Sequence, residues 1–450
     1  MFNYFRKRNR RRSAFVPVEG LESRQVLSPV LVTSTPGPGG SVSLKFTGTA
    51  GDDVVLVSSD NNLGIGVGGG EFILNGGTAK SNLVFASVRN ITFNLGAGSD
   101  TVVVENVSLN NITINDGVAV SDADRYRIFS SSGAMRVRDV AATFMMGAPE
   151  LTIEANRISE SATSISLNNI AARYVNTLSS HTRLLSNVGA ELDVAGEFRI
   201  DSLGASSRDT VSVLQTSSTT AKAVPLRFNG GTRLSLGGGN DFVFVIGTVD
   251  FHGQTVVDTG SGDDFLSFSA SRVIGDSGNI VCFGRVSIEM GDGIDNLSFE
   301  ADGAENHVRF MNHVCVSTGR DADFVNVFKS VFYSSLDVNL GNNTGPGSNA
   351  GVEDGMYVTQ VTVLGLTNVR SSGAASVAFH FAGDWTSRFV GNAKFTLGSG
   401  TITFGGSAGS QIIFESAQIF IGTRSKITVR YLGPVLANFA RRRLINAVVQ

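Results

Sequence analysis

The 450-residue chain is poor in cysteine, proline and charge, and these shortages exclude several classes of protein. Two cysteines are too few for a disulfide-stabilised scaffold. Eight prolines and an apolar content of 42% argue against a disordered chain. Charged residues make up only 17%, and no run of 18 apolar residues is present to span a membrane as a helix.

Basic residues gather at the two ends of the chain. Residues 1–25 and residues 426–450 each carry a net charge of +5, so the total of −3 leaves −13 for the middle. An acidic body is a poor surface for nucleic acid, whose phosphates require basic partners. We therefore expect no nucleic-acid partner, and we interpret most of the acids as solubilising groups on turns.

Glycine and phenylalanine are the abundant residues. Glycine, at 53 residues, is nearly twice as frequent as its usual share of about 7%. Phenylalanine outnumbers tyrosine by 30 to 6, which suits rings stacked inside a dry interior. The strand-like alternation between glycine-rich turns predicts an all-β fold.

One turn-and-strand unit recurs along the chain. LGGGNDFVFV, TGSGDDFLSF and MGDGIDNLSF place Asp241, Asp264 and Asp295 after Gly-x-Gly-x turns, and a fourth copy places Asp323. The steps are 23, 31 and 28 residues, which is typical of a solenoid whose coils bury their apolar faces by stacking. We predict a right-handed parallel β-helix over residues 41–430, with on the order of 14 coils.

Weaker copies extend the repeat in both directions, and one segment departs from it. Acidic residues recur roughly where the step places them: Asp53, Asp100, Asp124, Glu150, Asp209, Asp354 and Asp384. Between about 155 and 185 the periodicity is weak, so this region is a candidate lateral insertion.

The two ends differ from the body. An arginine-rich start is followed by Leu21, Glu22, Arg24 and Leu27, which resemble the LEPR-XLL motif of planctomycete-type extracellular proteins. The resemblance implies export to a bacterial cell surface or the medium, while a disordered basic tail is the alternative. Residues 1–40 would then be an export-like segment with a linker. Residues 431–450 have apolar residues at helical spacing, so we expect a short amphipathic helix that caps the rod.

The acidic turn resembles half of the calcium-binding RTX nonapeptide, Gly-Gly-x-Gly-x-Asp-x-U-x. In that family two such turns occur in each short coil, whereas here one occurs in each long coil, so a full calcium ladder is not expected. The alternative is that glycine permits the bend and the aspartate accepts backbone N–H groups of the turn. If Ca²⁺ binds, the candidate ligands are Asp241, Asp263, Asp264, Asp292, Asp295 and Asp323.

Two functions remain open. An exported, non-catalytic protein of a cell surface or matrix, with polysaccharide or other surface proteins as partners, fits the export-like start and the repeated turns. A polysaccharide lyase or hydrolase on the same fold is the alternative. Adjacent Asp263 and Asp264 should point to opposite faces of a strand, so both cannot line one site without a bend. A deep groove with three or more converging charged side chains would favour the enzyme.

Overall fold

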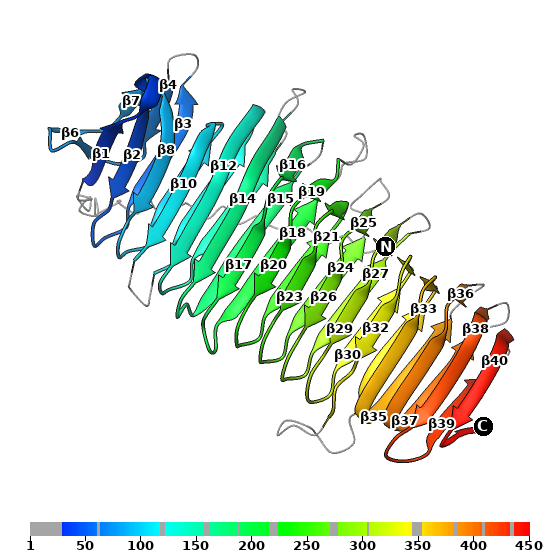
Figure 1. Ribbon diagram of the computed structural model, residues 1–450. Coiled ribbons are helices and arrows are strands. Elements are labelled where there is room, and N and C mark those ends of the chain that lie inside the picture. Colours follow the sequence, from blue (N-terminus) through cyan, green and yellow to red (C-terminus); the bar gives the residue numbers. More distant parts are fainter. Residues whose placement is uncertain are drawn as a thin grey trace, which may run out of the picture.

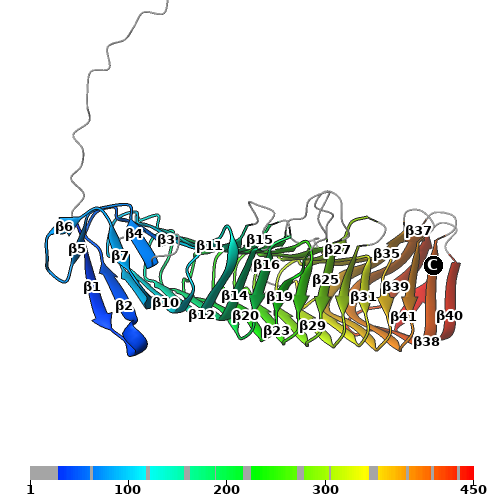
Figure 2. The ribbon, with the colours of Figure 1, turned by 90° about the horizontal axis from the view of Figure 1, so that it is seen from above.

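The protein is an elongated parallel β-solenoid (Figures 1 and 2), which confirms the predicted fold class. The computed structural model describes residues 29–60, 64–117, 122–156, 163–187, 189–215, 224–270, 278–303, 306–343, 353–381, 385–406, 410–432 and 436–450. These residues form 41 strands, and the strands of the rod pair in parallel with the matching strands of the next coil.

The parallel pairings define three sheets that run along the rod. The first sheet consists of β2 (Val42–Thr47), β8 (Val88–Asn94), β10 (Leu109–Asp116), β12 (Gly133–Phe144), β14 (Thr163–Tyr174), β17 (Phe198–Ser202), β20 (Thr232–Ser235), β23 (Thr255–Asp258), β26 (Val286–Glu289), β29 (Val314–Ser317), β32 (Leu336–Asn339), β35 (Thr367–Phe381), β37 (Ala393–Gly406), β38 (Gln411–Gly422) and β40 (Leu436–Ile445). The second sheet consists of β3 (Val54–Asp60), β9 (Thr101–Glu105), β11 (Arg125–Ser130), β13 (Glu150–Ala155), β15 (Ser179–Ser186), β18 (Arg208–Gln215), β21 (Phe242–Ile246), β24 (Phe265–Ala270), β27 (Asn296–Ala301), β30 (Phe324–Phe328), β33 (Asp354–Thr359), parts of β35 and β37, β39 (Ile427–Leu432) and β41 (Ala447–Val449). The third sheet consists of parts of β12 and β14, β16 (Glu191–Val194), β19 (Leu226–Phe228), β22 (Val249–Phe251), β25 (Asn279–Cys282), β28 (His307–Phe310), β31 (Ser330–Phe332), β34 (Thr362–Val363), β36 (Thr386–Phe389) and parts of β38 and β40.

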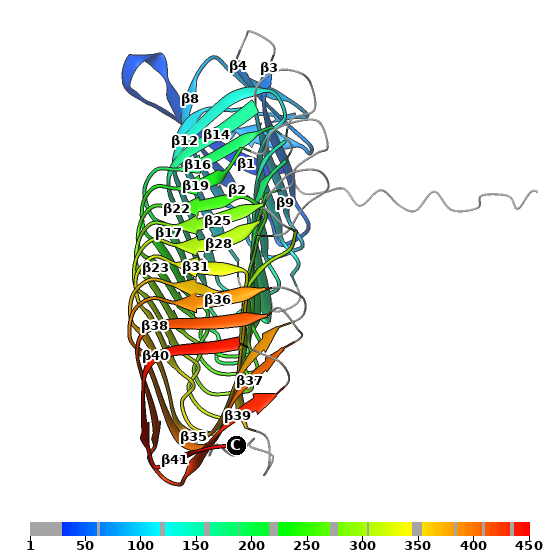
Figure 3. The ribbon, with the colours of Figure 1, turned by 90° about the vertical axis from the view of Figure 1, so that its right-hand side faces the viewer.

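Alternating side chains fill the shaft that the three sheets enclose. In β21, Val243 and Val245 are buried while the residues between them are partly exposed. Aromatic rings from successive coils stack inside, as in Phe228 on Phe251 at 4.9 Å and Phe310 on Phe332 at 4.8 Å between ring centroids. The predicted stacking of phenylalanine is therefore confirmed. Figure 3 shows the coils lying one above another around this interior.

Glycine occupies the corner between the first and second sheets because any side chain would collide with the coil below. Gly260, Gly291 and Gly319 all have positive φ, at 93°, 96° and 99°. A Cβ atom on Gly291 would lie 1.5 Å from the carbonyl oxygen of Gly260. This stacking explains why the Gly-x-Gly-x-Asp turn recurs once in each coil.

The N-terminal end of the rod differs from the body because several of its strands pair antiparallel. The segment expected as a linker forms β1 (Val30–Pro36) and a 3₁₀ turn (Pro38–Gly40), and β1 pairs antiparallel with β2. Short strands complete this end: β4 (Gly64–Gly68), β5 (Phe72–Leu74), β6 (Ala79–Lys80) and β7 (Leu83–Phe85). Of these, β5 also pairs in parallel with β1. Residues 1–28, which include the LEPR-XLL-like motif, lie outside the described residues.

The structure corrects three expectations. The predicted C-terminal helix is wrong: residues 436–445 and 447–449 form β40 and β41, and Phe439 pairs with Phe414 of the preceding coil. Pairing with an open sheet edge satisfies a row of backbone groups, whereas a short helix is only marginally stable alone. The predicted lateral insertion is also wrong, because β14 and β15 belong to the stack. The solenoid has about 10 turns, rather than on the order of 14 as we expected.

The two cysteines lie in different register positions of the rod. Cys315 pairs in register with Ser287 and not with Cys282, so both thiols are free, with Cys282 buried. Within the described ranges, no helix is long and apolar enough to cross a membrane.

Candidate functional site: a buried column of aspartates

The repeated aspartates form a column along the corner where the first sheet turns into the second. At most 2% of the surface of each is exposed. The members of this aspartate column are Asp53, Asp100, Asp124, Asp209, Asp241, Asp264, Asp295, Asp323 and Asp354. All but Asp384 of the predicted aspartate copies are thus in the column, and Asp384 lies outside the described residues.

One repeated hydrogen bond links the members. Apart from Asp124 and Asp354, each aspartate donates its backbone N–H to Oδ1 of the aspartate one coil further on, as from Asp241 to Asp264 at 2.8 Å and from Asp264 to Asp295 at 2.9 Å. The distances range from 2.7 Å between Asp53 and Asp100 to 3.5 Å between Asp323 and Asp354. The carboxylate supplies the acceptor that a buried corner amide needs.

The column is interrupted after Asp124, at the coils that contain Pro149 and Ser180. Pro149 follows Asp124 in the stack and has no N–H to donate, so the next coil requires no carboxylate. Ser180 stands there and donates its hydroxyl to Asp209 Oδ1 at 2.6 Å, where the column resumes. The spacing predicted Glu150 as a further copy, but Glu150 lies one residue beyond the column. Its carboxylate pairs with Arg183 on the outer face of the second sheet.

The six predicted calcium ligands separate into two groups. Asp241, Asp264, Asp295 and Asp323 are consecutive members of the column. Asp263 is exposed and accepts the N–H of Ile294 at 2.9 Å, which confirms that it faces away from its neighbour. Asp292 is exposed and pairs with Arg320 at 3.5 Å. Calcium binding to the column itself remains a prediction.

Burial disfavours the ionised form of the column aspartates. Burial raises the pKa of Asp241 and Asp323 to about 9 and that of Asp295 to about 8, against the lowering effect of the backbone N–H that each accepts. Two carboxylates about 5 Å apart repel by roughly 3 kcal/mol at an effective dielectric constant near 20. The Oδ2 atoms of these three aspartates are buried without a hydrogen-bond partner among the described residues. Bound protons or cations are therefore needed to neutralise the negative charge of the column.

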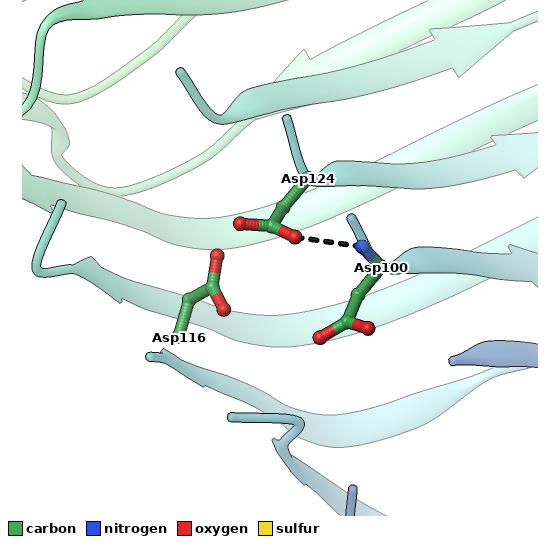
Figure 4. Close-up of side chains that lie close together, drawn as sticks. All are labelled: Asp100, Asp116 and Asp124. Carbon is green, nitrogen blue, oxygen red and sulfur yellow. Dashed lines mark hydrogen bonds between the residues drawn. The ribbon is translucent and has the colours of Figure 1, made fainter. Parts of the chain in front are cut away.

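A third carboxylate joins the column at one place. Asp116, the last residue of β10, lies beside Asp100 and Asp124, and one oxygen from each lies within 4.8 Å of the others (Figure 4). Among the described residues no other set of three acidic, histidine or cysteine side chains comes this close. Sequence reasoning missed Asp116, although the alternation of Ile112, Ile114 and Asp116 indicated that it points inward.

The outer face of the second sheet carries a shallow hollow rather than a deep groove. The hollow has a volume of about 160 Å³ and lies over β9, β11 and β13. Its charged residues form ion pairs, as in Arg127 with Glu154 at 2.5 Å and Arg183 with Glu150 at 3.4 Å. Ligand pockets usually measure about 300–1,000 Å³, so this hollow gives little support to an enzyme site.

No protein-family model, curated protein or solved structure matches this chain.

Proposed function

We propose that this chain is an exported, non-catalytic component of a bacterial cell surface or extracellular matrix. The observation that carries the proposal is the use of the repeated acids: they are buried and accept hydrogen bonds that join coil to coil. A polymer substrate needs catalytic carboxylates that it can reach, and the column aspartates are at most 2% exposed. The arginine-rich, LEPR-XLL-like start supports export.

Export is tested by locating the protein. A tagged full-length chain and a variant lacking residues 1–28 are expressed in a bacterium that possesses the matching export machinery, and the fractions are probed for the tag. We expect the full chain at the surface or in the medium and the shortened chain inside. An identical intracellular distribution of both would refute export.

A cell-surface polysaccharide is the partner that the outer face supports best. Phe242, Phe244 and Phe265 lie partly exposed on β21 and β24, with ring centroids 5.6–6.5 Å apart, and the guanidinium of Arg208 lies 4.5 Å from the ring of Phe242. Aromatic faces bind the apolar faces of sugars, and an arginine attracts acidic groups. Electrophoresis through gels that contain acidic polysaccharide should retard the protein, and Phe244→Ser should relieve the retardation. Equal mobility with and without polysaccharide would remove this partner.

The enzyme alternative rests on the hollow, where Arg125, Arg127 and Glu150 lie together. Incubation with a panel of acidic polysaccharides tests it. We expect no release of reducing ends or unsaturated sugars, and release that Arg127→Gln abolishes would establish the enzyme instead.

A further inference from the structure

Three acidic side chains converge at one corner near the N-terminal end of the rod. Asp100, Asp116 and Asp124 are 0%, 6% and 2% exposed, and an oxygen atom from each lies within 4.8 Å of the other two (Figure 4). The column bond from the N–H of Asp100 to Asp124 Oδ1, at 2.7 Å, fixes two of the three. This separation fits oxygen ligands around one divalent cation.

Asp116 occupies a position where the fold needs no acid. It stacks in register on Phe144, which in turn stacks on Tyr174, so the matching positions of the following coils hold buried rings. Its Oδ1 accepts the N–H of Gly117 at 2.7 Å, while its Oδ2 is buried with no partner within the described part of the chain. A buried acid that the coil stacking does not require points to a role beyond the fold.

Tyr126 supplies an independent observation. Its side chain is 1% exposed, and its hydroxyl has no hydrogen-bond partner among the described residues. Burial raises the pKa of this hydroxyl, and the nearby carboxylates of Asp116, Asp124 and Asp100 raise it further. An unpaired buried phenol is costly, and here it offers a neutral oxygen ligand beside the cluster.

Basic side chains do not balance these charges. None of the ion pairs formed by the described residues includes Asp100, Asp116 or Asp124. The neighbouring Arg125 and Arg127 have side chains that are exposed on the opposite face of β11, and Arg127 pairs with Glu154. The remaining means of neutralising the cluster are a bound cation or protons.

We propose that Asp100, Asp116, Asp124 and the hydroxyl of Tyr126 bind one divalent, oxygen-preferring cation of the Ca²⁺ type. The site joins the end of β10 to the starts of β9 and β11, so the cation fastens two coils of the rod at a place where an apolar contact is lost. It differs from calcium binding by the turn aspartates alone, because Asp116 is the last residue of β10 and not a turn residue. The competing explanation is a proton shared between Asp116 and Asp124.

The test uses the full chain, freed of metal with a chelator and then titrated with Ca²⁺ alone. We expect Ca²⁺ to raise the midpoint of thermal unfolding, and Asp116→Asn to weaken binding at least ~10-fold. Asp354→Asn is the matched control, because Asp354 is an equally buried column member at the other end of the rod. This control should keep the full Ca²⁺ response.

Terbium provides a readout that does not depend on stability. Tb³⁺ in the site should emit under tyrosine excitation, because the ring of Tyr126 would adjoin it. Tyr126→Phe should lower this emission strongly while leaving the other five tyrosines in place. If Asp116→Asn fails to fold, Tyr126→Phe alone decides the proposal.

Two results would overturn the proposal. Ca²⁺ could leave the unfolding midpoint unchanged while Asp116→Asn raises it equally with and without the ion, which would identify a shared proton. Alternatively, terbium emission and Ca²⁺ affinity could be the same in the wild type, Asp116→Asn and Tyr126→Phe, which would place any bound ion elsewhere.

Discussion

At the scale of single residues, the glycine of each corner turn is set by contact with the coil below. Gly291→Ala would place a Cβ atom 1.5 Å from the carbonyl oxygen of Gly260, at a φ of 96° that alanine rarely adopts. We expect a loss of about 3 kcal/mol or more in stability. Gly133→Ala is the control, since Gly133 has a similar φ of 71° but open space around it. Equal losses of stability in the two variants would show that contact with the neighbouring coil is not the reason why glycine is required at the corner.

The aspartates of the column are set by their acceptor oxygens rather than by their charge. Asp295→Asn keeps an oxygen for the N–H of Asp264, whereas Asp295→Ala leaves that buried amide without a partner. Alanine should therefore cost about 1–3 kcal/mol, and asparagine less than about 1 kcal/mol. Thermal unfolding of the two variants measures the difference. Equal damage from asparagine and alanine would mean that the negative charge itself is required.

At the scale of the column, stability should depend on pH. Burial raises the pKa of Asp241 and Asp323 to about 9 and of Asp295 to about 8, above the ordinary value of 3.8. Between about pH 4 and pH 9 the folded state therefore binds more protons than the unfolded state, so stability falls as pH rises. In the presence of chelator we expect a lower unfolding midpoint at pH 9 than at pH 5. A midpoint that rises over this range would contradict the burial of uncompensated carboxyls.

The sequence predicted the column because each member follows the same glycine-rich turn. Asp241, Asp264 and Asp295 could be placed by their spacing alone, and even the degenerate Asp124 and Asp209 fell into register. Asp116 could not be placed, because it ends a strand of the first sheet whereas Asp100 and Asp124 precede strands of the second sheet, and the three meet across the corner between the sheets. A site formed between two sheets leaves no period in the sequence.

The two ends of the rod were predicted less well than its body. Residues 436–445 have apolar side chains that match a helix as well as a strand, and only the edge of β38 decides between them. The antiparallel hairpin of β1 and β2 was hidden in a segment whose glycines and prolines are typical of a linker. Periodicity predicts the coils that repeat, whereas the structure at each end occurs only once and leaves no repeat in the sequence.

At the scale of the whole molecule, each coil contacts chiefly its neighbours, so damage should remain local. In Gly291→Ala we expect limited proteolysis to cut near the coils that contain β23–β30. A fragment that contains β9–β15 should survive, since none of the strand pairings among the described residues links it directly to the altered turn. Simultaneous loss of both halves of the rod would show that it unfolds as one unit.

The aspartates of the repeated turns join successive coils through hydrogen bonds from backbone N–H groups. Hydrogen–deuterium exchange of the intact protein tests this linkage at the amides of Asp209, Asp241 and Asp264, which donate to the next carboxylate at 2.7–2.9 Å. The account predicts that these corner amides exchange as slowly as those of the adjoining strands β21 and β24. Exchange at the rate of an exposed turn would contradict it.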